Sequence, residues 1–185
     1  MSMSTKRLAD LITLGRAAGA LAFAGWALIG GSPILPWAAA FMLANWTGDV
    51  LDGALARRSP TARPTWIGSH DLEVDMWVAG CLLTYLALAG LVNARLAVGY
   101  ALASVVVLAA TGWPRALAML CQAPIYAGFI FVVVERAPAA AVWLVLWPPA
   151  AVLLTWPKFP KVVVPEFLAG VRTVWDHRPG QRRKV

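Results

Sequence analysis

The chain has 185 residues, of which 60% are hydrophobic and 14% charged, and its mean hydropathy is +0.68. About 25% of the residues of a soluble domain are charged. This composition therefore excludes a soluble domain and indicates an integral membrane protein. The net charge of +7 does not indicate nucleic-acid binding, because most basic residues lie in short loops and near the two ends, where they determine membrane topology.

The first thirty residues predict an interfacial amphipathic helix that leads into a first membrane span. Leu8, Leu11 and Ile12 fall on one side of a helix, and an apolar run then continues to Gly30. No small-residue cleavage pattern follows, so we expect this segment to remain as an anchor. The sequence Gly30-Gly31-Ser32-Pro33 predicts a tight turn after it.

Five further apolar runs predict an all-α membrane protein with six transmembrane helices. They extend over residues 34–58, 76–92, 96–111, 116–134 and 139–156, near the ~17–25 residues that a spanning helix needs. We therefore expect a six-helix membrane domain over residues 1–156. Residues 157–185 are expected to form a cytoplasmic tail with a short surface helix and a basic end.

The distribution of basic residues predicts the orientation. With six spans and the N-terminus inside, Arg95 and Arg136 alone among the 16 Lys and Arg residues fall outside. Because positively charged loops stay in the cytoplasm, we expect a protein of the cytoplasmic membrane whose two termini face the cytoplasm. The acidic stretch described next would lie on the same side.

Residues 45–75 hold five of the nine acidic residues of the chain. Asp49 and Asp52 are three apart on one helix face, which also carries Asn45, and Asp71 and Asp75 are four apart on the next helix. Carboxylates in a membrane protein are costly and usually serve a function. Four of them aimed at one site favour Mg²⁺, Mn²⁺ or Ca²⁺, since no Cys or His cluster is near. A solvated helix end is the alternative for Asp49 and Asp52.

Small residues beside the acids predict room for a ligand. Gly53 and Ala56 leave a shallow place on the helix, and Arg57 could pair with a phosphate there. Close packing against another helix is the alternative explanation for the two small residues. On this interpretation the carboxylates hold metal ions against a diphosphate, because Mg²⁺ is commonly bound by a few carboxylates together with substrate phosphates.

These residues resemble the signature of the CDP-alcohol phosphotransferases, D-x-x-D-G-x-x-A-R followed by G-x-x-x-D-x-x-x-D. Residues 49–57, DVLDGALAR, match the first half at every fixed position, and residues 71–75, DLEVD, match the end. The segment LITLGR near the N-terminus is also similar to the family's juxtamembrane segment. Gly68 departs from the pattern, because two residues separate it from Asp71 where the family has three, and the gap after Arg57 is longer than the family's. It is either the family's glycine shifted by one position or a turn residue.

The resemblance implies a metal-dependent transfer of a substituted phosphate from a CDP-alcohol to the hydroxyl of a second alcohol, with release of CMP. It further implies that Asp49, Asp52 and Asp71 bind the metal, together with Asp75, which would also be the general base. Two Mg²⁺ or Mn²⁺ ions are expected. The residues implied to line the cytidine diphosphate site are Gly53, Ala56, Arg57 and Gly68.

For the substrates, we expect CDP-diacylglycerol and a small soluble acceptor, with glycerol 3-phosphate as the first choice, in phospholipid biosynthesis. Inositol phosphate, serine or another alcohol stays open as acceptor. Arg63 and Arg115 are candidates for binding an acceptor phosphate, although topology signals or lipid headgroups explain them equally well. Membrane lipids are expected partners, and the resemblance implies a homodimer. The alternatives are a non-catalytic membrane protein with a carboxylate cation site, such as a transporter, channel or scaffold, and an inactive family member.

Overall fold

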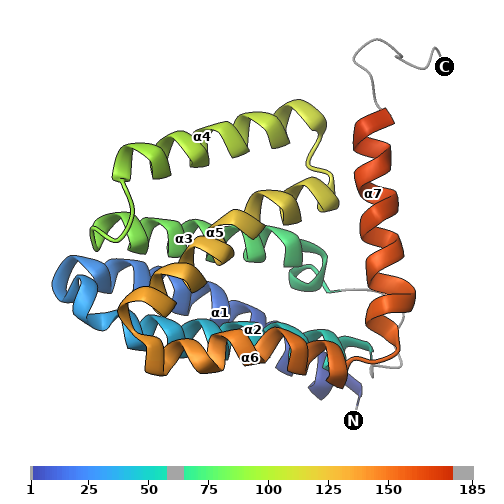
Figure 1. Ribbon diagram of the computed structural model, residues 1–185. Helices are drawn as coiled ribbons and strands as arrows, with labels where there is room; N and C mark the ends of the chain where they lie inside the picture. Colours follow the sequence, from blue (N-terminus) through green and yellow to red (C-terminus); the bar gives the residue numbers. More distant parts are fainter. Residues whose placement is uncertain (1, 58–64, 177–185) are drawn as a thin grey trace.

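The regular structure of the chain is entirely helical over residues 2–57 and 65–176, which are the residues that the computed structural model describes (Figure 1). The long helices are α1 (Ser2–Gly30), α2 (Leu35–Arg57), α3 (Asp71–Leu88), α4 (Ala94–Thr111), α5 (Arg115–Arg136), α6 (Pro138–Leu154) and α7 (Val164–Asp176). Short helical turns lie between some of them: η1 (Ser32–Ile34), η2 (Ile67–His70) and η3 (Phe159–Val163). The predicted all-α fold is confirmed.

Local sequence signals set several helix ends. Asn93 caps α4 with its side chain, because Asn93 Oδ1 accepts hydrogen bonds from the backbone N–H groups of Arg95 at 3.0 Å and Leu96 at 3.2 Å. At the other end of α4, Gly112 adopts the left-handed conformation with φ 77°, which glycine reaches without steric cost. These ends lie where the sequence predicts breaks.

The interfacial position expected for the N-terminal segment stays a prediction, and its helix is continuous with the first span. The predicted amphipathic segment and the first span form one continuous helix, α1, from Ser2 to Gly30. The physical reason is that no proline precedes Pro33, so nothing removes a backbone hydrogen bond where the two parts meet. The polar residues in the N-terminal half of α1 therefore keep a fixed position relative to its apolar C-terminal half.

An aromatic cluster joins the first three helices. The ring of Phe23 on α1 stacks on Phe41 of α2 with centroids 5.3 Å apart and lies 4.6 Å from the ring of Tyr85 on α3. The same core continues through Phe129 of α5 and Leu144 of α6, both 0% exposed. Burial of these large side chains holds α1, α2, α3, α5 and α6 together.

The two remaining helices lie at the edge of this bundle (Figure 1). Helix α4 packs against α3 and α5, and Ala97 and Leu108 are its buried residues. Helix α7 stands across the ends of the other helices and contacts α5. A Cβ atom added to Gly170 of α7 would lie 2.8 Å from the Cβ of Ala116 on α5, so the two helices approach closely there.

Within residues 2–57 and 65–176, three helices are long and apolar enough to cross a membrane: α1 from Lys6, α4 and α5. A fourth span is counted if α6 and the segment Phe159–Arg172, which are bent by 85°, form one broken span. An all-α chain with several helices able to span a membrane is therefore confirmed, whereas the count of six spans stays a prediction. Helix α6 is short, with 17 residues, and α3 carries Asp71, Glu73 and Asp75 within 18 residues. The same carboxylates that build the predicted site thus lower the apolar character of α3.

Candidate functional site

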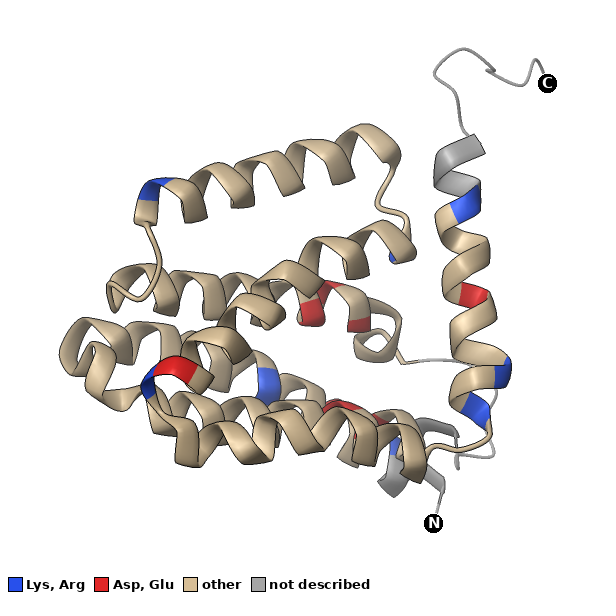
Figure 2. Ribbon diagram, in the orientation of Figure 1, with Lys and Arg blue, Asp and Glu red and all other residues tan. Residues whose placement is uncertain are grey.

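The predicted site residues come together where the C-terminal half of α2 faces the start of α3. Figure 2 shows acidic residues on these two helices at the end of the bundle that α7 crosses. Asp49 and Asp52 lie on α2, and Asp71 is the first residue of α3 with Asp75 one turn later. The helical spacing predicted from the sequence places both pairs on facing surfaces.

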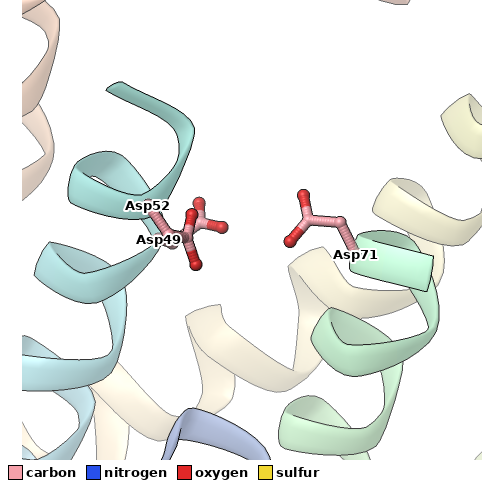
Figure 3. Close-up of side chains that lie close together, drawn as sticks. All are labelled: Asp49, Asp52 and Asp71. Atoms are coloured by element: carbon pink, nitrogen blue, oxygen red, sulfur yellow. The ribbon is translucent and has the colours of Figure 1, made fainter. Parts of the chain in front are cut away.

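Three carboxylates form a compact group. Asp49, Asp52 and Asp71 each offer one oxygen, and these oxygens all lie within 4.8 Å of one another (Figure 3). Asp52 is buried, with 5% exposure, whereas the side chains of Asp49 and Asp71 are 42% and 33% exposed. One wall of the group is therefore enclosed by protein and the other is open. Hard oxygen donors at this separation suit a divalent cation such as Mg²⁺ or Mn²⁺.

A basic side chain reaches into this group from α1. Arg16 Nη1 lies 2.9 Å from Asp49 Oδ1, 3.2 Å from Asp52 Oδ2 and 3.8 Å from Asp71 Oδ1. Arg16 Nη2 donates to Asp75 Oδ1 at 2.5 Å. Asp75 thus joins the site through Arg16, and not as a member of the three-carboxylate group. Arg16 itself is 7% exposed.

Two neutral side chains complete the buried wall. Thr13, one turn before Arg16 on α1, donates its hydroxyl to Asp52 Oδ2 at 2.9 Å. Asn45 on α2 accepts from Arg16 Nε at 3.3 Å through its Oδ1 atom. Asn45 is 3% exposed, and its Nδ2 atom has no hydrogen-bond partner in the described part of the chain. A buried donor without a partner is costly, which makes this amide a candidate contact for a ligand.

Sequence reasoning did not assign a role in the site to Arg16, Thr13 or Asn45. A signal was present for Arg16, because an arginine in the middle of an apolar helix is rare and usually functional. It entered the prediction only as a topology signal and as the last residue of the segment LITLGR, with no role in the site. The role of Gly48 was missed as well. A Cβ added there would lie 3.3 Å from Arg16 Cδ, so the absence of a side chain at Gly48 makes room for the side chain of Arg16 next to α2.

Aromatic side chains support the α2 side of the site. The ring of Trp46, next to Asn45, lies 5.7 Å from the ring of Tyr126 on α5 and 5.9 Å from that of Trp147 on α6. Trp147 Nε1 in turn donates to the hydroxyl of Thr47 at 2.9 Å. These contacts fix the rotation of α2 about its axis and hence the direction of its carboxylates.

The other predicted binding residues lie on α2 and in η2. Gly53 is half-buried on α2, one residue after Asp52, and Ala56 and Arg57 are the last two residues of that helix. Gly68 lies in η2, exposed, and its N–H donates to Thr65 Oγ1 at 3.0 Å.

The two arginines predicted for an acceptor phosphate stay untested. Arg63 lies outside the described residues. Arg115 is exposed as the first residue of α5.

Residues around Gly68 tie the start of α3 to α1. Thr65, which accepts from Gly68, donates its own hydroxyl to Asp10 Oδ1 at 2.6 Å. This bond holds η2 against the N-terminal half of α1, and η2 leads directly into Asp71. The turn therefore positions the first carboxylate of α3 relative to the helix that carries Arg16.

An apolar groove of about 660 Å³ is lined by residues of α1 and α2. It begins near Gly19, three residues after Arg16, and near Phe41, one turn before Asn45. Gly25, Trp26 and other apolar residues continue it toward the far end of the two helices. The groove therefore starts about one helical turn from the carboxylate site and leads away from it.

No protein-family model, curated protein or solved structure matches the chain. The fold and the site together define its class: an all-helical protein with several helices able to cross a membrane and an aspartate cluster able to hold a metal ion. The resemblance to the CDP-alcohol phosphotransferases continues to rest on the motif residues themselves.

Proposed function

We propose that this protein is a membrane-bound CDP-alcohol phosphotransferase that uses divalent metal ions. In the proposed reaction it transfers the substituted phosphate of a CDP-linked lipid, CDP-diacylglycerol first, to an alcohol acceptor, with glycerol 3-phosphate the first candidate, and releases CMP. The observation that supports this most directly is the grouping of Asp49, Asp52 and Asp71, which come from two helices and belong to one spaced motif, with their oxygens within 4.8 Å.

The donor set fits the metal that this chemistry requires. Asp49, Asp52 and Asp71 would hold Mg²⁺ or Mn²⁺, and the resemblance adds Asp75 as a ligand and implies two ions. When bound, the ions would neutralise charge on the diphosphate and stabilise CMP as the leaving group. The open side of the group, formed by the partly exposed Asp49 and Asp71, is where a diphosphate could approach.

Asp75 is the proposed general base. Its carboxylate would take the proton of the acceptor hydroxyl while the alcohol oxygen forms a bond to the lipid-linked phosphorus. The bond from that phosphorus to the bridging oxygen breaks, and its electron pair leaves with CMP. Asp75 Oδ1 accepts a hydrogen bond from Arg16. Either this ion pair opens before the proton transfer, or the other carboxylate oxygen of Asp75, Oδ2, accepts the proton.

The apolar groove is the proposed place for an acyl chain of the lipid substrate. It is lined by apolar side chains and glycines, and it begins about one turn from Arg16 and Asn45. A lipid whose diphosphate sits at the carboxylates could therefore extend its chain along α1 and α2 without leaving the membrane. The remaining proposals follow from the resemblance and the charge distribution: a cytoplasmic site, six spans and a homodimer.

One experiment tests the reaction directly. Purified protein is incubated with Mg²⁺ or Mn²⁺, CDP-diacylglycerol carrying a radiolabel in the cytidine, and a panel of acceptors that includes glycerol 3-phosphate, inositol phosphate and serine. We expect CMP release with one acceptor and none when chelator replaces the metal. The absence of CMP release with every acceptor would reject the enzymatic proposal.

A non-catalytic cation-binding protein, or an inactive member of the family, is the second candidate. The favouring observation is Arg16, since a guanidinium paired with several carboxylates is also how a purely structural ion network is built. Asp75→Asn separates the two. For the enzyme it should abolish turnover and leave cytidine nucleotide binding largely intact, whereas a transporter, channel or scaffold should bind no cytidine nucleotide at all.

A further inference from the structure

Arg16 occupies the position at the carboxylates where a cation is most strongly attracted. Its Nη1 atom contacts one oxygen of each of the three grouped aspartates, at 2.9, 3.2 and 3.8 Å. Those three residues are also the group able to hold a metal ion. The guanidinium of Arg16 therefore already forms ion pairs with the three carboxylates that would bind a divalent cation. Two cations within a few ångströms repel strongly in a site that is shielded from water.

The arginine cannot leave the carboxylates without a new partner. Arg16 is 7% exposed, and a guanidinium in such a place is stable only while its N–H groups find acceptors. Metal loading by itself would therefore leave a buried positive charge next to the metal. An anion that enters with the metal would remove this penalty, because guanidinium groups bind phosphate oxygens through two parallel hydrogen bonds.

A second observation points to such an anion. The Nδ2 atom of Asn45 is buried and has no partner among the described residues, while Oδ1 of the same amide accepts from Arg16 Nε. The unpaired donor is thus at the edge of the carboxylate group, beside the arginine. A donor can be satisfied by an oxygen of an anionic ligand and not by a metal ion. An anion that enters with the metal would therefore give acceptor oxygens to Asn45 Nδ2 as well as to Arg16.

We propose that Arg16 is a built-in counter-cation that competes with a divalent metal ion for Asp49, Asp52 and Asp71, and that it moves to the diphosphate of the ligand when both bind. Its departure also frees Asp75. Metal and diphosphate then bind cooperatively, and by linkage each raises the affinity of the other by the same factor. The diphosphate rests on the proposed function, whereas the competition between Arg16 and the metal does not.

The competition is tested by Mn²⁺ binding, followed as the loss of the free Mn²⁺ signal in electron paramagnetic resonance. The purified full-length protein is compared with Arg16→Gln and with Arg95→Gln, which removes an exposed arginine at the start of α4. We expect Arg16→Gln to lower the Kd for Mn²⁺ at least about tenfold and Arg95→Gln to leave it unchanged. An equal or weaker affinity in Arg16→Gln would overturn the proposal.

The transfer to the diphosphate is tested by repeating the titration with saturating CDP, after subtraction of the complex that CDP forms with Mn²⁺ in buffer. CDP should tighten Mn²⁺ binding several-fold more in the unaltered protein than in Arg16→Gln. An equal effect in both proteins would overturn the transfer. If the unaltered protein releases no CMP while Arg16→Gln still binds Mn²⁺ more tightly, the proposed function fails and the competition stands.

Removal of Arg16 leaves four carboxylates without their counter-cation, so Arg16→Gln is also followed by thermal unfolding with and without Mn²⁺. We expect its melting temperature to be lower than that of the unaltered protein in chelator and to recover in Mn²⁺. If it does not fold in either condition, Arg16→Lys decides the matter. Lysine keeps the charge but lacks the planar fork that reaches several carboxylates, so Mn²⁺ should bind more tightly than to the unaltered protein. Unchanged affinity would overturn the proposal.

Discussion

Asp52 is the carboxylate that the protein encloses most completely. Its Oδ2 atom accepts from Thr13 at 2.9 Å and from Arg16 at 3.2 Å, and the residue is 5% exposed. Both contacts come from α1, so they fix the direction of the side chain before any ligand arrives. A carboxylate held in this way is pre-organised, which is what a metal ligand at an active site requires.

Asp52→Asn should therefore reduce CMP release at least about 100-fold, because the loss of a direct ligand costs no less than the loss of an outer-shell partner. The measurement is the initial rate with CDP-diacylglycerol and the preferred acceptor. Glu73→Gln is the matched control, since Glu73 is exposed on α3 and lies off the face of Asp71 and Asp75. It should retain nearly full activity. Substantial activity in Asp52→Asn would contradict the metal assignment.

Thr13 gives a separate prediction about stability. Replacement by valine keeps the shape of the side chain and removes the donor to Asp52, leaving a buried carboxylate oxygen with one fewer partner at a cost of about 1–3 kcal/mol. Thr13→Val should lower the melting temperature in detergent. Thr84→Val is the control, because the Thr84 hydroxyl is exposed and bonds Gly80 O of its own helix at 2.8 Å. Equal melting temperatures of the two variants would contradict the role of the Thr13 bond.

At the scale of the elements, α1 does more than anchor the chain. Its N-terminal half supplies Thr13 and Arg16 to the carboxylates of α2 and α3, and its C-terminal half lines the apolar groove. Because α1 is one unbroken helix, the polar site and the groove keep a fixed distance from each other. This arrangement suits a ligand with a charged head and an apolar chain.

Gly25 provides a way to test the groove. It lines the groove, and a Cβ added there meets nothing within 4 Å, so a side chain at this position can start into the groove. We expect this variant to lose activity with long-chain CDP-diacylglycerol and to keep it with a short-chain analogue. Gly99→Leu on α4 is the control, because Gly99 is also exposed in a helix with open space around it. Equal chain-length profiles of the two variants would show that the groove does not hold the acyl chain.

The sequence predicts the elements better than their contacts, for a physical reason. The capping side chain of Asn93 and the left-handed Gly112 act within a few residues, so the ends of α4 are encoded locally. The placement of Asp49 and Asp52 on one face of α2 is also encoded locally, because it follows from their three-residue spacing in a helix. By contrast, Arg16 meets Asp75 across 59 residues of sequence. No short-range pattern encodes that contact, which depends on how α1 packs against α2 and α3.

At the scale of the whole molecule, the number and direction of the spans are the main predictions that stay open. Six spans place the α3 start inside and the turn between α3 and α4 outside. Among the helices that the structure describes, three, or four with the bent pair, meet the requirements of a span by length and composition. Helix α3 does not, because its first turns carry carboxylates. If α3 nevertheless crosses the membrane, its two ends must be reached by reagents from opposite sides.

Cysteine labelling distinguishes these cases. Glu73→Cys at the start of α3 and Arg95→Cys at the start of α4 are made singly, in a chain whose Cys81 and Cys121, both free thiols, are replaced by alanine. Both positions are exposed. A membrane-impermeant maleimide should label Arg95→Cys in intact cells and Glu73→Cys only in inverted membrane vesicles, because the excess of basic residues keeps the acidic site in the cytoplasm. Labelling of both positions from one side would show that α3 does not cross. The reverse pattern would place the carboxylates, and with them the proposed reaction, outside the cytoplasm, and would contradict the predicted orientation.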